Sequence, residues 1–356
     1  MIQKFRKNIS RGSILLLVVT FLLALTLDAC SAKSMAISST ELSQATVEPT
    51  LLLSTATMVL PADVSYSTPT PPVPTKTSQT GACLTLEKWN QLAVQNDPLP
   101  SGLGGKLLTT VDEGDGANLP TIYLGGLDGA NLQKMDIGAW PSLSSDGSRL
   151  IYMAADNLYV VDLASGQRST PGLDGYYFVW SPDDSRIMYT TMSDLFIANA
   201  DGSDVRKVDT GPAKVISPVG WLPDNQTIVY SAMNGSGFDY KSYNLQSSKK
   251  ADLFTVVSKA GFGAISPDGQ WIVFMDLFNT PPGMFISRLD GTARKWIAES
   301  QVPASFNSVW SPDGQWLVLN TQNLDGIQIP LLVNPFTCQM VHLGNVKGVV
   351  VGWSPK

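Results

Sequence analysis

Few side chains in this sequence have the types and spacing that catalysis or metal binding requires. The chain has a single histidine, His342, so a site that needs several histidines as metal ligands is excluded. His342 falls in an expected outer strand and is interpreted as a structural or surface residue. The sequence has no Gly-x-Ser-x-Gly nucleophile elbow, which argues against a peptidase of that kind. No cofactor is expected.

An acidic, glycine-rich loop is the one candidate for a bound cation. Residues 112–118 read Asp-Glu-Gly-Asp-Gly-Ala-Asn, and the carboxylate oxygens of Asp112 and Asp115 are ligands that suit Ca²⁺. The loop lacks the full spacing of a calcium-binding loop. A solvated turn without a metal is therefore the alternative.

The first residues of the chain indicate export. Basic residues within the first eleven positions are followed by the apolar run 14–27 and then by Leu27-Asp28-Ala29-Cys30. A helix of about fourteen residues rises about 21 Å, less than the roughly 30 Å hydrocarbon core of a bilayer, which favours a cleaved signal peptide. Residues 1–29 thus resemble a bacterial lipoprotein signal peptide ending at a lipidated Cys30, with Asp28 as a departure from the usual pattern. A plain signal peptide and an uncleaved anchor are the alternatives, and all three place the rest outside the cytoplasm.

The charge of the chain argues against a nucleic-acid partner. The formal net charge is -6, and the part from Cys30 onward has 20 basic and 29 acidic residues, a balance of -9. Affinity for nucleic acid comes mostly from basic side chains that neutralise phosphates. The same balance argues against a polybasic hold on anionic lipid.

Two short regions precede the bulk of the chain. Residues 30–81 are rich in Ser, Thr and Pro and predict a tether or a disordered linker that does not fold by itself. Residues 82–101 predict a short helical segment, because apolar residues between positions 84 and 96 recur at helical spacing after a possible N-cap, Thr85.

The remaining cysteines, Cys83 and Cys338, form a candidate disulfide. In an oxidising compartment such a pair is usually bridged. The bridge would hold the helical segment against the last complete repeat, near the place where the two ends of the chain meet. Two unpaired thiols are the alternative.

A repeated turn organises residues 102–356. Ser-Pro-Asp-Gly occurs at 266–269 and 311–314, and related versions occur at 144–147, 181–184 and 222–225. The third positions of these turns are spaced by 37, 41, 44 and 45 residues. Four short strands in a period of about 40 to 50 residues are the signature of a propeller blade.

The two ends of this region predict how the ring closes. Residues 106–110 and 121–124 look like the second and third strands of a blade without its first strand, and residues 349–353 look like a first strand with nothing after it. Joined, they complete one blade and leave no open sheet edge. With blades beginning near 140, 177, 218, 262 and 307, the fold class is an all-β, six-bladed propeller of four-stranded blades.

The pattern of an aromatic residue, Ser-Pro-Asp-Gly and an apolar strand resembles the WD40-like repeats of the TolB propeller from about residue 102 onward. The resemblance implies the fold and a non-catalytic, envelope-located protein that binds a protein or peptide. TolB itself has an α/β domain before its propeller, whereas here only about twenty residues separate the tether from the ring. TolB's own role is therefore not assigned to this chain.

Topology predicts where binding would occur. The Ser-Pro-Asp-Gly turns lie on one face of the ring, called here the turn face. The loops between second and third strands and those between blades share the opposite face, the variable mouth, where recognition tends to occur. Exposed aromatic residues there are candidate interface anchors. The candidate binding residues, beside Asp112 and Asp115, are Tyr176, Tyr177, Phe238, Asp239, Tyr240, Phe278, Phe306 and Asn307.

Two other functions stay open at this point. A propeller that binds or cleaves carbohydrate would use acids at the mouth, and hydrolysis would require a carboxylate pair within about 5 to 10 Å. The other possible function is that of a spacer or sensor domain outside the cytoplasm, for which a partner protein would supply the signalling. The acids considered for hydrolysis are Asp112, Asp156, Asp194 and Asp325.

Overall fold

A computed structural model describes residues 81–91, 98–114, 119–155, 157–191, 193–210, 215–257, 262–276, 282–299, 304–322 and 328–355. The predicted signal peptide, Cys30 and the tether lie outside these residues. No helix within them is long and apolar enough to cross a bilayer.

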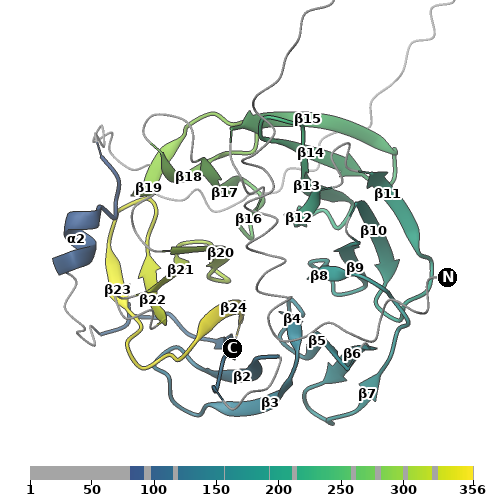
Figure 1. The fold of residues 1–356 in the computed structure, drawn as a ribbon, viewed down its shortest axis with the longest axis horizontal. Helices are drawn as coiled ribbons and strands as arrows, with labels where there is room; N and C mark the ends of the chain where they lie inside the picture. The colour runs from purple at the N-terminus through teal and green to yellow at the C-terminus, as the bar shows by residue number, and fades with distance from the viewer. Residues whose placement is uncertain are drawn as a thin grey trace, which may run out of the picture. The chain divides into compact units, whose positions relative to one another are not determined.

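The strands form six antiparallel sheets of four, which confirms the predicted propeller. Figure 1 shows the six sheets arranged around a ring, with one strand of each next to the centre. The innermost strands pack against one another all the way round: β24, β4, β8, β12, β16, β20 and again β24.

The first three blades come from the two ends and the first part of the propeller region. Blade 1 contains β24 (Val349–Ser354), β1 (Lys106–Val111), β2 (Thr121–Gly126) and β3 (Gln133–Ile137). Blade 2 contains β4 (Ala139–Leu143), β5 (Arg149–Ala154), β6 (Asn157–Asp162) and β7 (Arg168–Ser169). Blade 3 contains β8 (Tyr176–Trp180), β9 (Arg186–Thr190), β10 (Asp194–Asn199) and β11 (Arg206–Thr210).

The other three blades follow in chain order. Blade 4 contains β12 (Ile216–Trp221), β13 (Thr227–Met233), β14 (Phe238–Asn244) and β15 (Lys249–Val256). Blade 5 contains β16 (Gly263–Ile265), β17 (Trp271–Asp276), β18 (Gly283–Arg288) and β19 (Lys295–Glu299). Blade 6 contains β20 (Ala304–Trp310), β21 (Leu317–Gln322), β22 (Gln328–Val333) and β23 (Met340–His342).

The Ser-Pro-Asp-Gly turn forms because its own side chains satisfy its backbone. In blade 6 the Ser311 hydroxyl donates to Asp313 at 2.5 Å and accepts the backbone N–H of Trp316 at 2.9 Å. Asp313 in turn accepts the N–H of Gln315 at 3.0 Å. Gly314 supplies the positive φ of 68° that the turn requires. The aspartate thus caps the turn, as the sequence predicted.

Blade 1 is closed by the C-terminal strand, as predicted. Strand β24 pairs with β1 from Lys106 opposite Ser354 to Thr110 opposite Val349. A buried amide from blade 6 reinforces this strand: the Asn320 side chain donates to the carbonyl of Val350 at 2.8 Å and accepts its N–H at 2.7 Å. Backbone pairing within blade 1, the Asn320 side chain and hydrophobic packing of β24 against blade 6 therefore hold the ring closed.

The helical segment docks on the outside of the ring. Helix α2 (Leu86–Gln91) follows an extended stretch in which Leu84 pairs in parallel with Ala298 of β19. Thr85 is the N-cap, because its hydroxyl accepts the N–H of Lys88 at 3.1 Å. Trp89 is buried in a core that blades 5 and 6 share.

The position of this segment corrects the sequence analysis. Cys83 forms a disulfide with Cys338, which lies between β22 and β23 of blade 6, with a Cα–Cα distance of 5.0 Å. We expected the segment near the place where the chain ends meet, but its backbone pairs with β19 of blade 5 instead. The unpaired outer edge of β19 accepts the extra strand, and this joins blade 5 to blade 6.

The amide from blade 6 leads to a stability prediction. Replacing Asn320 by Leu removes both hydrogen bonds to Val350 and leaves two buried backbone groups unsatisfied, so the free energy of unfolding should fall by about 2–4 kcal/mol. Urea denaturation measures the change. Gln322→Leu, on the same strand but half-buried, is the control and should change stability by about 0.5 kcal/mol or less. Equal effects of the two variants would contradict the role given to Asn320.

The disulfide leads to a second prediction. Alkylation of the unfolded protein without reductant should leave Cys83 and Cys338 unlabelled in a peptide map, and reduction should make both reactive. Changing both cysteines to Ser should make α2 more sensitive to proteolysis, because backbone pairing with β19 and the packing of Trp89 then hold the segment without a covalent bond. The ring should remain folded, since its own strands do not depend on the bridge. Labelling of both cysteines before reduction would rule out the bridge.

Candidate binding site at the variable mouth

Two aromatic side chains are presented at the variable mouth by β-bulges. The pairing of β4 with β5 shifts register between Ala139 and Ser142, and that of β8 with β9 shifts between Tyr176 and Val179. Within these bulges Trp140 and Tyr177 have positive φ values of 49° and 54°. Such a conformation is uncommon for bulky residues, and bulges commonly re-aim a side chain. Trp140 and Tyr177 are 38% and 43% exposed.

These rings belong to a cluster that extends over three blades. Trp140 packs edge-on against Tyr176, with ring centroids 4.7 Å apart, and lies 6.3 Å from Tyr177. The ring of Tyr177 lies 5.8 Å from that of Phe262, which directly precedes β16. Blade 4 separates blades 3 and 5 around the ring, so this contact reaches past it. We call Trp140, Tyr176, Tyr177 and Phe262 the aromatic cluster.

A hydrogen bond from a buried residue fixes the backbone of the cluster at Phe262. The buried Tyr240 hydroxyl donates to the carbonyl of Phe262 at 3.0 Å, which fixes the backbone where β16 begins. Burial raises the pKa of Tyr240, so its hydroxyl remains a donor at any physiological pH. Desolvation also raises the pKa of Tyr177, with a smaller opposing effect from Trp140. Trp140 and Tyr177 thus combine a large apolar ring with one polar atom that can form hydrogen bonds.

Two of the candidate residues are part of the core instead. Phe238 and Tyr240 are 1% and 0% exposed and pack among residues of blades 4 and 5. Strand β14 begins at Phe238, and alternate residues of a strand face the same side. That side is covered by the neighbouring blade, so the proposal that Phe238 and Tyr240 contact a partner was wrong.

Asp239, between them, faces the opposite side of β14. Its carboxylate accepts hydrogen bonds from Asn234 and Thr255, each at 2.7 Å, and lies 3.9 Å from the ammonium of Lys241. Asp239 also lines a cavity of about 360 Å³ between blades 3 and 4, where Lys250 is paired with Asp209 at 2.8 Å. These charges satisfy one another, and the carboxylate of Asp239 is already engaged.

The acids considered for catalysis or metal binding are only partly described. Asp194 pairs with Lys207 at 2.9 Å, and this hydrogen bond is the main cause of its lowered pKa. Asp112 accepts the N–H of Gly114 at 2.9 Å, as in a simple turn. Among the residues that the structure describes, no group of three or more His, Cys, Asp or Glu could hold a metal ion.

Several candidates cannot be placed. Phe306 and Asn307 belong to β20, but their side chains lie outside the description. Four more lie outside the described residues altogether: Asp115, Asp156, Phe278 and Asp325.

Sequence reasoning missed Trp140 and Phe262, although a signal for both was present. Trp140, Tyr177 and Phe262 each stand four positions before the first residue of their blade's turn motif. The same position in blades 4, 6 and 1 holds Pro218, Asn307 and Val350. Comparing the repeats at this one position would have identified the three aromatic residues of the mouth as a set.

Comparison with known proteins supports the fold. No protein-family model matches the sequence. No curated protein matches it either. TolB from Acinetobacter baumannii is similar in structure, with a TM-score of 0.59 and 18% identity over 72% of this chain and 69% of that one. A putative TolB from Agrobacterium tumefaciens gives a TM-score of 0.51 and 17% identity over 68% of this chain and 89% of that one.

An oligogalacturonate lyase in complex with manganese also matches, with a TM-score of 0.42 and 14% identity over 61% of this chain and 82% of that chain. Similarity at that level supports no inference about activity. The comparisons and the six closed blades together show a TolB-like six-bladed propeller fold.

Proposed function

We propose that this protein is a non-catalytic, membrane-anchored propeller outside the cytoplasm that binds a protein or peptide at its variable mouth. The observation that carries the proposal is the aromatic cluster, in which Trp140 and Tyr177 are partly exposed although both are large apolar side chains. Exposed aromatic residues on a rigid scaffold are the usual anchors of protein interfaces.

The rigidity of the cluster supports binding as its purpose. Its residues lie on or beside the innermost strands β4, β8 and β16, whose positions are set by the closed ring. The rings therefore lose little conformational freedom when a partner covers them, which lowers the entropic cost of association. Side chains on long surface loops would not have this advantage.

The proposal of a membrane anchor is based on the sequence. The apolar run before Cys30 and the Ser/Thr/Pro-rich residues that follow are the expected parts of a lipid anchor and a tether. A lipidated Cys30 would hold the propeller at a membrane surface while the tether allows it to reach a partner.

The anchor leads to a prediction. Cys30→Ser should prevent attachment of lipid and move the protein from the membrane fraction to the soluble or secreted fraction, which fractionation and intact mass would show. Cys83→Ser is a matched control, because it also removes a cysteine but lies far from the expected cleavage site; it should leave the lipid in place. Equal lipid labelling of Cys30→Ser and the unchanged protein would contradict the anchor.

The mouth leads to another prediction. Trp140→Gly with Tyr177→Gly removes both rings while glycine retains the positive φ of the bulges, so the fold should persist. After mild crosslinking in the cell envelope, the unchanged protein should capture one partner protein. The variant's affinity for that purified partner should be at least about tenfold lower, as expected for the loss of two anchors.

Leu132→Ala is the control for this experiment, since Leu132 is 38% exposed but lies in the turn between β2 and β3 on the turn face. Unchanged affinity of the mouth variant would contradict the proposed site. Loss of binding to a polysaccharide, with no protein captured by the unchanged chain, would instead favour the carbohydrate-binding alternative.

A further inference from the structure

A second cavity lies on the opposite face, away from the aromatic cluster. It has a volume of about 470 Å³, within the range of sites for small ligands. Blade 3 contributes residues at the ends of β9, β10 and β11, and blade 4 contributes the turn before β13 and the turn after β14. Its position between two blades is independent of the proposed function of the mouth.

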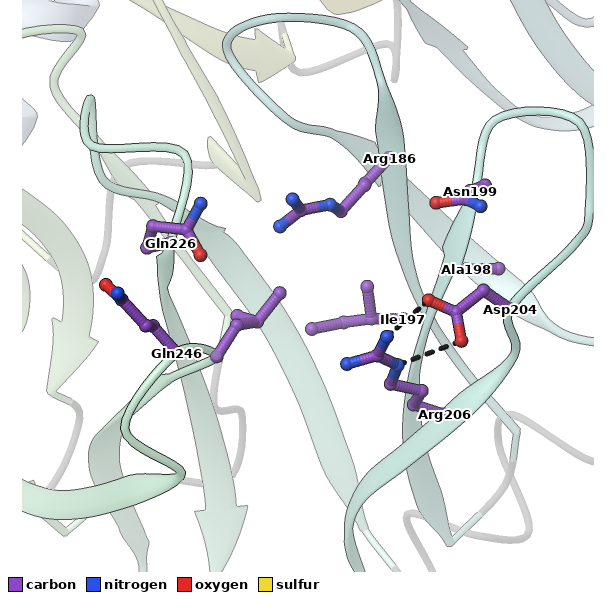
Figure 2. Close-up of a pocket in the computed structure, with 9 residues that line it drawn as sticks. Arg186, Ile197, Ala198, Asn199, Asp204, Arg206, Gln226 and Gln246 are labelled. Carbon is purple, nitrogen blue, oxygen red and sulfur yellow. Dashed lines mark hydrogen bonds and ion pairs between the residues drawn. The ribbon is translucent and has the colours of Figure 1, made fainter.

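The floor of the cavity is apolar and its walls are polar. Ile197 and Ala198 are buried below it, and Leu245 is half-buried beside them. Figure 2 shows Gln226 and Gln246 on one side and the pair of Asp204 and Arg206 on the other. The guanidinium of Arg186 extends into the space between these two walls.

The residues that line the cavity carry more positive than negative charge. The Arg206 guanidinium holds Asp204 through two hydrogen bonds of 2.6 and 3.0 Å, and this contact lowers the pKa of Asp204. Arg186 makes no ion pair with any described residue. Among the lining residues, two arginines stand against one carboxylate, an excess of one positive charge, although the charge of Asp183 outside the lining also acts on Arg186.

Arg186 also has hydrogen-bonding capacity to spare. One of its nitrogens donates to the carbonyl of Asn225 at 3.2 Å. An arginine has five N–H donors, so most of them remain available to a ligand. The side-chain amides of Gln226 and Gln246 likewise have no hydrogen-bond partner among the described residues, and both line the cavity.

The preceding blade contains an internal comparison. Arg149 occupies the same place in blade 2 that Arg186 occupies in blade 3, and it too donates to a carbonyl of the next blade, that of Asp184. The guanidinium of Arg149, however, lies 4.6 Å from the centre of the Trp180 ring. No described aromatic ring covers Arg186 in this way. The structural hydrogen bond is thus common to both arginines, while the open guanidinium belongs to Arg186.

We propose that this cavity binds the carboxylate of a small, singly charged organic acid that also carries amide or hydroxyl groups. Arg186 would receive the carboxylate through charge-assisted hydrogen bonds, and Gln226 and Gln246 would bind the neutral polar groups. A single negative charge matches the one unbalanced arginine, whereas a doubly charged phosphate would approach Asp204 with an excess of negative charge. The carboxy terminus of a peptide and a free hydroxy acid share this chemistry.

The test is calorimetric titration of the full chain in mild detergent. The probes are acetyl-Gly-Ala, its carboxy-terminal amide, and gluconate as a hydroxy acid. Acetyl-Gly-Ala should bind at least about tenfold more tightly than the amide, because charge-assisted hydrogen bonds are lost in the amide. Tighter binding of acetyl-Gly-Ala than of gluconate would support a peptide terminus as the ligand, and the reverse order would support a hydroxy acid at the same site.

The variants assign the binding to this cavity. Arg186→Gln should weaken binding of the better acid at least about tenfold. Arg149→Gln, which loses the equivalent structural hydrogen bond, should leave it unchanged, as should Trp140→Gly with Tyr177→Gly. Gln246→Ala removes an exposed side chain that has no structural hydrogen bond, so it should weaken binding without unfolding the protein. Equal affinity for acid and amide, unchanged binding by a folded Arg186→Gln variant, or no binding of either acid would overturn the proposal.

Discussion

Closure of the ring is the constraint on which the rest of this structure depends. Strand β24 pairs with β1, which lies about 240 residues earlier in the chain, and Asn320 bonds both backbone groups of Val350. Only a closed ring sets the spacing at which Tyr177 of blade 3 meets Phe262 of blade 5. The same spacing determines which faces of the outer strands are covered by the next blade.

The two faces of the ring have different roles: the turn face is structural, and the variable mouth differs from blade to blade. On the turn face, side chains of Ser and Asp satisfy the turn backbone in blades 2, 3, 5 and 6, and Asp224 alone does so in blade 4. Asp184 and Asn225 also accept N–H groups of the preceding blade. These bonds join blade 2 to blade 3 and blade 3 to blade 4. At the variable mouth the position four residues before each turn has no such role, so its side chain can be aromatic in three blades and different in the other three.

The two proposed sites differ in physical character. The aromatic cluster is apolar and electrically neutral, which suits a broad contact that excludes water. The cavity on the turn face, between blades 3 and 4, has polar walls and an arginine without an ion-pair partner among the described residues, which suits a small anion. Because they lie on opposite faces, a partner at the mouth would leave the cavity accessible.

The sequence by itself determined the number of blades, the turns and the closing strand, because these follow from hydrogen bonds within a few residues and from the period of the repeat. It did not determine which side of β14 is buried, so Phe238 and Tyr240 could not be separated from the exposed Tyr177. It also did not show that Leu84 would pair with β19, or that Arg186 would face an open cavity. These features depend on how neighbouring blades pack against each other. Contacts between blades join residues about 40 positions apart in the sequence, so no local pattern specifies them and only the tertiary structure decides them.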